Sequence, residues 1–544
     1  MKKITGLIFI LSLSFQISAK SQSKKYDALL NEMFEKDGPG GVALVVKGGK
    51  TIYRKAFGMA NLELDVKMKP ENVFRIGSIT KQFTATAIMQ LVEQGKIKLD
   101  ADITDYIKDY PTHGHSITIE HLLTHTSGIK SYTGLEKWTH EVHKKDFTPE
   151  EMVNYFKNEP MDFAPGEKFK YNNSGYFLLG YIIEIVSGQS YADYINEHIF
   201  KPLKMNNSYY GGNSPIIKNR AAGYDKDDAG YKNDQFLSMT QPFAAGSLLS
   251  TVDDLSTWYM AVMDDKVMSK ESRIKAHSFF KLNSGEISEY GFGWSIGNIQ
   301  GSPMISHNGG INGFLSASNY LTNEKVFIVV LSNCLCNYPG EITKKMAAIA
   351  IGKPFEWKQI SLDKKLLKSY EGVYSSKSKE ERIITFENGK LYSMRTGRSK
   401  HELLAYAKDK FFFDDDTVTL EFVRNTQNKL DSVRLKSTAA DKTWQRTNKP
   451  IPEIIKIDVD KKQFEKYIGE YALTGDFHLK MFAEDEKMYI QATGQQKIEI
   501  VGTAKHKFSL IGVDAQLTFN LDDKDKVISV TLHQNGDQVA KRID

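Results

Sequence analysis

The stretch Phe74-Arg-Ile-Gly-Ser-Ile-Thr-Lys-Gln-Phe83 opens an apolar-periodic run that ends at Gly95. This spacing predicts a helix with Ser78 in its first turn and Lys81 on the same face, one turn later. A serine hydroxyl is a weak nucleophile at neutral pH, so a neighbouring amine must accept its proton. A lysine does this only if burial or nearby cations lower its pKa. The free N–H groups at the helix N-terminus would also face the oxyanion that forms when Ser78 attacks a carbonyl.

The Ser-x-x-Lys spacing is not specific by itself. An N-cap serine followed by a solvated lysine explains most such matches. The spacing recurs elsewhere in the chain, for example at Ser21, Ser278, Ser361 and Ser376. Context favours Ser78, because Gly77 before it lets the backbone turn sharply and approach a ligand. The helix behind it also reads as buried, through Phe83, Ala87, Ile88, Leu91 and Val92.

Tyr171 and Asn173 stand at the entrance to a strongly apolar helix expected over Phe177 to Val186. A phenol at this place could carry protons, and an amide could hold a substrate carbonyl. The alternative for Tyr171 is an aromatic residue that staples the helix entry. Tyr-x-Asn is also a common spacing, and it recurs at Tyr194 and Tyr231.

A strand-rich section follows Tyr290, and within it lies Ile305-Ser-His-Asn-Gly-Gly-Ile-Asn-Gly-Phe314. His307 and Gly309 share one face of the expected strand, because strand residues two apart point the same way. The glycines at 309, 310 and 313 would let a substrate backbone lie close to this strand.

Four histidines raise the alternative of a zinc site: His113, His115, His121 and His125. The last two are four residues apart on one face of a short helix expected to begin at Thr118 and end at Gly128. No glutamate follows His121, as the helix of a metallopeptidase would require. No Asp-His follows His115, as a metallo-hydrolase loop would require. We therefore expect structural histidines in a buried turn, and no metal.

Ser78-x-x-Lys81, Tyr171-x-Asn173 and His307-x-Gly309 stand in this order along the chain. The ordered triplet resembles the active site of the penicillin-recognising serine hydrolases, which include class C β-lactamases, serine DD-peptidases, D-aminopeptidases and related esterases. Three flanking stretches are also similar to the family: Phe74 to Phe83, Thr118 to Ile129 and His307 to Phe314. The resemblance covers roughly residues 25–350.

The resemblance implies an α+β catalytic domain, in which an antiparallel sheet covered by helices joins a helical insert and the site lies in the cleft. Ser78 would be the acylated nucleophile, and Lys81 and Tyr171 would share the general acid and base work. Asn173 would position the substrate amide. The backbone N–H groups of Ser78 and Gly310 would form the oxyanion hole. No metal or organic cofactor is implied.

The third motif departs from the β-lactamases. They carry Lys-Thr-Gly or a near variant, whose lysine and hydroxyl help to hold a substrate carboxylate, where this chain has His307-Asn308-Gly309. A histidine near neutrality supplies less fixed positive charge than a lysine. A His-x-Gly motif is similar to D-aminopeptidases and esterases of the family, so efficient β-lactamase activity is not expected.

The amino terminus reads as a secretory signal peptide, with Met1-Lys-Lys, an apolar stretch from Ile4 to Ile17, and Ser18-Ala19. We expect cleavage after Ala19 and a periplasmic or secreted protein with no membrane span in its mature form. The formal net charge of +5 is too small to indicate nucleic-acid binding. A bond between Cys334 and Cys336 would be strained on a strand, so no disulfide framework is expected and the core must hold the fold.

From about residue 360 the sequence consists of short alternating strands and is duplicated. Tyr370-Glu-Gly-Val-Tyr374 matches Tyr467-Ile-Gly-Glu-Tyr471, and the same offset of 97 residues (467 − 370) aligns four further positions or pairs. Each copy is long enough for a small antiparallel β-barrel. The predicted limits are residues 1–19 for the signal peptide, 20–358 for the catalytic domain, and 359–449 and 450–544 for the two barrels.

The sequence thus predicts an exported serine hydrolase that forms an acyl-enzyme at Ser78. Its expected substrates are small peptides containing D-amino acids, amides or esters, with cell-wall-derived peptides among the candidates. The alternatives are a DD-carboxypeptidase, a weak β-lactamase, a penicillin-binding or muropeptide-sensing protein that is acylated without turnover, and a binding protein in which the barrels matter most.

Overall fold

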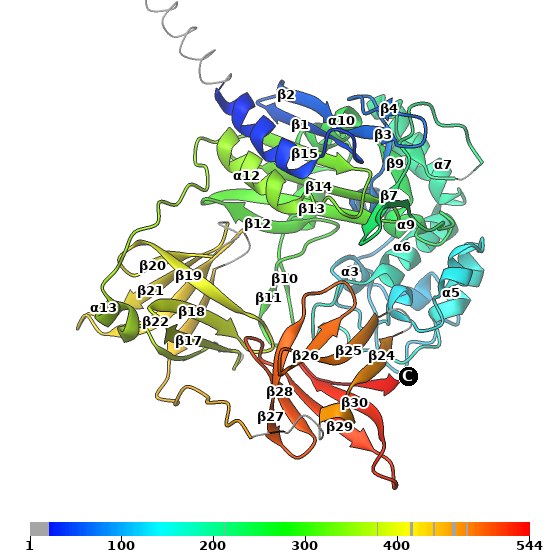
Figure 1. Cartoon of the computed structure of the whole chain (residues 1–544). Coiled ribbons are helices and arrows are strands. Elements are labelled where there is room, and N and C mark those ends of the chain that lie inside the picture. Colours follow the sequence, from blue (N-terminus) through cyan, green and yellow to red (C-terminus); the bar gives the residue numbers. More distant parts are fainter. Residues whose placement is uncertain are drawn as a thin grey trace, which may run out of the picture. The chain divides into compact units, whose positions relative to one another are not determined.

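The computed structural model describes residues 21–544, apart from residues 213, 378, 414–416, 439–440, 458, 460–463 and 475–476 (Figure 1). The expected signal peptide lies outside the described residues. The chain forms two compact units, one that reaches Phe355 and takes in a short piece around Thr438, and one built from the remainder beyond Glu356.

The first unit is built around one antiparallel sheet. In spatial order its strands are β12 (Ser295–Ile299), β13 (Ser302–Ile311), β14 (Phe314–Leu321), β15 (Val326–Ser332), β1 (Gly41–Lys47) and β2 (Lys50–Phe57). Strand β1 lies in the sheet beside β15, with Val42 opposite Leu331, so both ends of this unit contribute to one sheet. The hairpin expected from Val42 to Tyr53 is present as β1 and β2.

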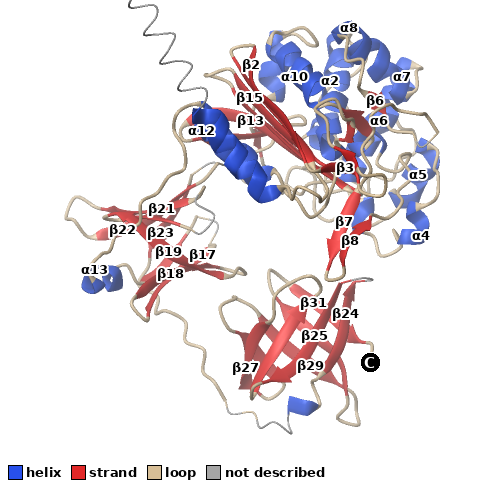
Figure 2. Cartoon of the chain, turned by 45° about the horizontal axis from the view of Figure 1, so that its top comes forward, coloured by secondary structure: helices blue, strands red, loops and turns tan. Residues whose placement is uncertain are grey.

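The two faces of this sheet are covered by different helices, which explains the continuous apolar run in β1. Val42, Leu44 and Val46 pack into the larger core, with the helix α10 (Val252–Met263). Ala43 and Val45 point to the opposite face, against the helix at residues 21–33 and α12 (Gly340–Ala350), which Figure 2 shows on the sheet. A strand buried on both faces needs apolar residues at every position.

The helical insert lies between β5 and β12 in the sequence and packs into the larger core. Its longest helices are α2 (Thr80–Glu93) and α6 (Asn173–Ser187). The shorter ones are α3 (Ile119–Leu123), α4 (His140–His143), α5 (Pro149–Phe156), α7 (Tyr191–Ile195), α8 (Lys201–Leu203), α9 (Phe243–Gly246) and α11 (Lys270–Ala276). The short strands of the unit are β3 (Met59–Asn61), β4 (Val66–Lys67), β5 (Phe74–Arg75), β6 (Tyr209–Tyr210), β7 (Tyr224–Asp227), β8 (Gly230–Asn233), β9 (Leu248–Ser250), β10 (Phe280–Lys281) and β11 (Ile287–Ser288).

Cys334 and Cys336 form a disulfide, with their Cα atoms 5.1 Å apart. The sequence-based expectation that these cysteines stay unpaired is therefore wrong. Both residues lie beyond the end of β15, in a turn rather than on the strand that the expectation assumed. A turn brings the two Cα atoms into the ordinary range for a disulfide.

The second unit contains two closed antiparallel barrels, which confirms the prediction. The helix α13 (Lys364–Ser369) leads into the first barrel, and β16 pairs with β23 to close it. Its strands are β16 (Gly372–Ser375), β17 (Glu381–Glu387), β18 (Lys390–Arg395), β19 (Lys400–Ala407), β20 (Lys410–Phe412), β21 (Thr419–Arg424), β22 (Leu430–Lys436) and β23 (Lys442–Arg446). Those of the second are β24 (Gly469–Thr474), β25 (Phe477–Glu484), β26 (Lys487–Ala492), β27 (Ile498–Ala504), β28 (Lys507–Leu510), β29 (Gln516–Leu521), β30 (Val527–His533) and β31 (Asp537–Arg542).

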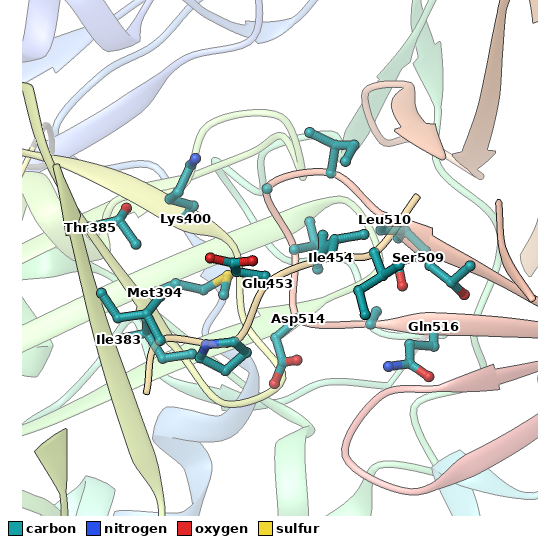
Figure 3. Close-up of a pocket in the computed structure, with 18 of the residues that line it drawn as sticks. Ile383, Thr385, Met394, Lys400, Glu453, Ile454, Ser509, Leu510, Asp514 and Gln516 are labelled. Atoms are coloured by element: carbon teal, nitrogen blue, oxygen red, sulfur yellow. The ribbon is translucent and has the colours of Figure 1, made fainter. Parts of the chain in front are cut away.

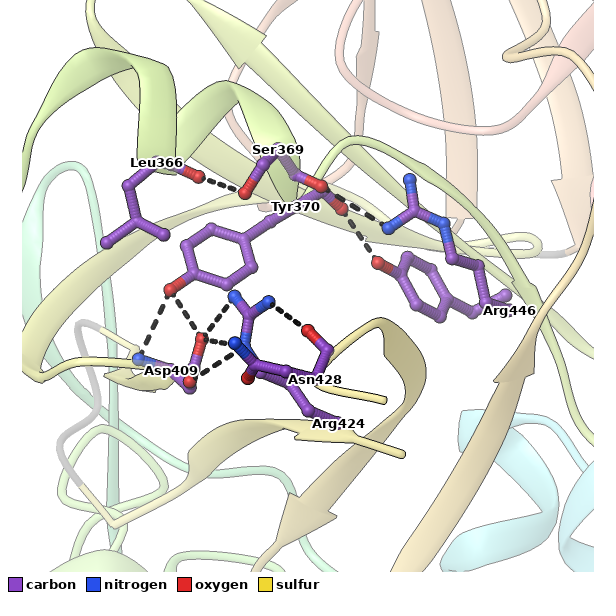
Figure 4. Close-up of polar contacts among 8 residues, drawn as sticks. Leu366, Ser369, Tyr370, Asp409, Arg424, Asn428 and Arg446 are labelled. Carbon is purple, nitrogen blue, oxygen red and sulfur yellow. Dashed lines mark hydrogen bonds and ion pairs between the residues drawn. The ribbon is translucent and has the colours of Figure 1, made fainter. Parts of the chain in front are cut away.

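The repeated tyrosines make the same local hydrogen bond in each barrel. In the first barrel the Tyr374 hydroxyl donates to the Tyr370 carbonyl oxygen at 2.8 Å, and Arg446 donates to backbone carbonyls beside Tyr370 (Figure 4). In the second, Tyr471 donates to the Tyr467 carbonyl at the same distance. The duplicated Tyr-x-x-x-Tyr pattern therefore has a structural role, in which a buried phenol donates a hydrogen bond to a backbone carbonyl.

Facing parts of the two barrels and the segment that joins them line a hollow of about 500 Å³ (Figure 3). Its walls include Ile383 and Met394 from the first barrel, Leu510 from the second, and Ile454 from the joining segment. Ile454 keeps 45% of its surface exposed there. Within the described residues, we find no helix with both the length and the apolar character that crossing a bilayer requires.

Candidate active site

Ser78 lies in a 3-10 turn, Gly77–Ile79, that joins β5 to α2. Two glycines let this turn pack directly on β13. Gly77 has φ of +51°, and a Cβ there would lie 2.9 Å from the Gly310 nitrogen. A Cβ at Gly309 would lie 2.1 Å from the Ile76 carbonyl oxygen. The third motif therefore needs glycine because two backbones meet there, a close approach that any side chain would prevent.

Lys81 is completely buried on α2, and its Nζ lies within hydrogen-bond distance of three oxygens. These are Ser78 Oγ at 3.1 Å, Asn173 Oδ1 at 2.9 Å and the Ala245 carbonyl at 2.8 Å. Burial lowers the pKa of Lys81 well below its ordinary value. A neutral amine has two hydrogens, and the amide and carbonyl oxygens can only accept hydrogen bonds. The lone pair of a neutral Lys81 is thus left for the Ser78 hydroxyl.

Tyr171 lies against both Lys81 and Ser78. Lys81 Nζ lies 4.7 Å from the centre of the Tyr171 ring. Burial of the phenol raises its pKa, and a hydrogen bond with Ser78 partly offsets that rise. The hydroxyl is therefore protonated at neutral pH and can donate to Ser78 or to a leaving group.

His307 is 5% exposed, and both of its ring nitrogens are engaged. Nδ1 lies 2.5 Å from the Asn308 carbonyl, so it carries the proton, and Nε2 lies 2.8 Å from the Tyr290 hydroxyl and can accept from it. Burial, together with Lys81 when that amine is protonated, lowers the pKa of His307 to about 3. At neutral pH the third motif therefore contributes a neutral imidazole rather than a fixed cation.

His125 and Tyr290 also belong to the site, although the sequence did not identify them as part of it. The backbone N–H of Asn172, which stands between the two residues of the second motif, donates to His125 Nδ1 at 3.1 Å. The His125 ring lies 4.2 Å from that of Tyr171 and 4.7 Å from that of Tyr290. Burial, together with Lys81 when that amine is protonated, lowers the pKa of His125 well below its usual value.

Two of the four histidines weighed as zinc ligands, His121 and His125, make local contacts in the structure. His121 Nδ1 accepts from the Thr118 N–H and completes a capping box at the start of α3. His125 has φ of +59° and lies just after α3, as the expected buried turn requires. The described residues contain no group of three or more histidine, cysteine or acidic side chains placed to hold a metal ion.

A hollow of about 110 Å³ opens beside the nucleophile, and its walls include Ser78, Asn173 and Gly310. The structure therefore brings the first two motifs into hydrogen-bond contact and places the third against the Ser78 turn. The roles assigned to Ser78, Lys81, Tyr171, Asn173, His307, Gly309 and Gly310 stay predictions.

Comparison with known proteins identifies the family of the chain. The family model described as Beta-lactamase matches residues 26–353. The chain belongs to this family. Penicillin-binding protein 4* of Bacillus subtilis is similar at 30% identity, over 74% of this chain and 94% of that protein. Both the predicted family and the predicted class of enzyme, a serine hydrolase, are confirmed.

Solved structures of other proteins are also similar to this β-lactamase-family protein. The octameric penicillin-binding protein homologue from Pyrococcus abyssi aligns with a TM-score of 0.56 at 29% identity, over 78% of this chain and 99% of that one. A D-stereospecific amidohydrolase from Streptomyces sp. aligns with a TM-score of 0.52 at 26% identity, over 60% of this chain and 98% of that one. The predicted fold of the catalytic domain is thereby confirmed.

Proposed function

We propose that this serine hydrolase cleaves amide or ester bonds of small substrates through an acyl-enzyme at Ser78, and that peptides or amides of D-amino acids are its substrate class. The observation that carries the mechanism is the set of three oxygens around Lys81 Nζ, which leaves the lone pair of the neutral amine for Ser78.

In the acylation step, Ser78 Oγ attacks the substrate carbonyl carbon while its proton passes to Lys81 Nζ. Tyr171 gives its proton to the departing amine or alcohol and takes one back from Lys81, so the pair ends as it began. The developing oxyanion would be held by the N–H groups of Ser78 and Gly310. Water then attacks the ester, and the same transfers in reverse release the acid and restore Ser78.

The substrate class is supported by His307. A neutral, buried imidazole with both nitrogens engaged offers no cation to a terminal carboxylate. This favours simple amides and esters, which lack a free terminal carboxylate, over substrates that end in a free acid. The likeness to a D-stereospecific amidohydrolase points the same way.

A second candidate is a penicillin-binding or DD-carboxypeptidase activity. It is favoured by the 30% identity to penicillin-binding protein 4*, which this chain matches over nearly the whole length of that protein. In this reading the enzyme would be acylated by penicillin and would act on cell-wall peptides. We also propose export of the protein: the amino terminus supports it, as does the Cys334–Cys336 disulfide, since disulfides persist in oxidising compartments.

One experiment separates these candidates. Purified mature protein and its Ser78→Ala variant would be labelled with a fluorophosphonate and with a fluorescent penicillin, and then assayed on D- and L-phenylalanine amide. Fluorophosphonate labelling with turnover of the D-amide supports the proposal. Labelling by both reagents without amide turnover supports the second candidate. If Ser78→Ala still labels, the nucleophile is another residue.

A further inference from the structure

One end of the first barrel holds a buried cation, which is unusual in a barrel interior. Arg382 of β17 is 5% exposed, and its guanidinium lies 4.3 Å from the centre of the Trp444 ring. Its Nη1 donates to Ser393 Oγ at 2.7 Å, whereas its Nε is buried with no acceptor among the described residues. Burial and the charge of Arg395 lower the pKa of Arg382 to about 10, which leaves it charged at neutral pH.

A hollow of about 670 Å³ opens beside Arg382, and its lining is strongly basic. Arg395, Arg398 and His401 line it as well, together with Ser393 and apolar side chains that include Phe413. Arg395 has a carboxylate, that of Glu380, at 3.8 Å. Among the described carboxylates, none lies within ion-pair distance of Arg382 or Arg398. Within the described part of the chain, the positive charges on this wall therefore exceed the carboxylates that lie within ion-pair distance of them.

The second barrel is an internal comparison for this wall, because strand pairing fixes the equivalent positions. Tyr374 pairs with Arg382 in the first barrel, and Tyr471 pairs with Leu479 in the second. The same registers relate Ser393 to Ile490, Arg395 to Ala492 and His401 to Ile498. Leu479 and Ile490 belong to the apolar core of the second barrel.

The same barrel architecture therefore closes with an apolar wall in one copy and a cationic wall in the other. Burying an unpaired charge is costly, and an apolar side chain of similar size usually serves stability as well or better. The charges of the first barrel are not needed to form the fold, and a bound counter-ion would compensate them.

We propose that this end of the first barrel is a binding site for a multiply charged oxyanion, such as a phosphate ester or a dicarboxylate, held by Arg382, Arg395 and Arg398. Guanidinium groups present forked donors that match phosphate and carboxylate oxygens in pairs. The serine hydroxyls would take a further oxygen, and Phe413 would contact the apolar part of an organic ligand. The site makes no use of Ser78 and is independent of the proposed hydrolase activity.

The test is isothermal titration of the mature full-length chain with phosphate, glycerol phosphate and succinate, against sodium chloride at matched ionic strength. Arg382→Leu installs the residue that the second barrel has, while Arg395→Gln and Arg398→Gln change side chains that reach solvent. Arg434→Gln, an exposed arginine of the same barrel, is the matched control. We expect at least tenfold weaker binding in the first three variants, less than a twofold change in the control, and undiminished binding in Ser78→Ala.

Two results would overturn the proposal. The first is ligand binding that sodium chloride at matched ionic strength abolishes, or that Arg434→Gln weakens as much as Arg398→Gln does. Either result would show attraction by general surface charge rather than a defined site. The second concerns the sequence between Phe413 and Val418, which contains three aspartates outside the described residues. Binding that appears only after these are changed to asparagine would show that the chain's own carboxylates occupy the arginines. Preference for phosphates over succinate, or the reverse, would identify which oxyanion the site takes.

Discussion

Gly309→Ala tests whether close packing between β13 and the Ser78 turn positions the nucleophile. The added Cβ would lie 2.1 Å from the Ile76 carbonyl oxygen and 2.3 Å from Ser316 Oγ. To reach the 3.4 Å of an ordinary contact, the strand and the turn must separate by about 1.3 Å. A misplacement of about 1 Å costs on the order of 100-fold in rate, and overpacking of this kind destabilises by about 1–3 kcal/mol.

We therefore expect Gly309→Ala to lower kcat/KM about 100-fold on an activated ester, together with a fall in the melting temperature. Gly310→Ala is the matched control for stability, because a Cβ there meets only a Leu315 side-chain atom at 3.4 Å. Its melting temperature should stay near that of the wild type. Wild-type kinetics and stability in Gly309→Ala would refute the packing argument, since they would show that the two backbones separate without consequence for Ser78.

Four other predictions concern the same site. Ser78→Ala should abolish turnover and keep the wild-type melting temperature; residual turnover near wild type would exclude Ser78 as nucleophile. Because burial lowers the pKa of Lys81 well below its ordinary value, kcat/KM should reach its plateau at a lower pH than a solvated lysine would allow, and should fall as pH drops through that lowered pKa; a profile that rises only toward about pH 10 would contradict this. His307→Lys should raise kcat/KM for carboxylate-bearing substrates relative to amides about threefold, the value of an exposed ion pair; an unchanged ratio would mean that the third motif does not select for charge. EDTA should leave activity unchanged, and a loss that zinc restores would revive a metal role for the histidines.

The sequence predicted the nucleophile, its lysine and the three-motif order because each lies in a short local pattern. Three glycines and an apolar helix also predicted where these motifs would stand. The same reasoning missed His125 and Tyr290, because their place at the site depends on contacts between segments far apart in the chain. His125 was interpreted as a buried structural residue, which its contact with Asn172 N–H confirms, but nothing local showed that it also packs on Tyr171.

The two barrels were predictable for a different reason. Duplication repeats every spacing, so a constant offset of 97 residues showed two like domains before any strand was placed. Arg382 escaped notice, because an arginine that follows two glutamates at the start of a short strand reads as part of a solvated surface. Only closure of the barrel puts that arginine inside, over Trp444. The disulfide was missed because both cysteines were assumed to lie on a strand, whereas they lie in the turn that follows β15.

The position of β1 beside β15 also determines when the catalytic unit can form. The Gly40 N–H donates to Asn333 Oδ1 across 293 positions of sequence, and β1 is paired with β15 along its whole length. A ribosome must therefore synthesise more than three hundred residues before the apolar strand Val42–Val46 finds its second neighbour. Until then the β1–β2 hairpin has an open hydrophobic edge, and such edges invite aggregation. The nascent chain should accordingly depend on a chaperone or a carrier that binds extended apolar segments during synthesis.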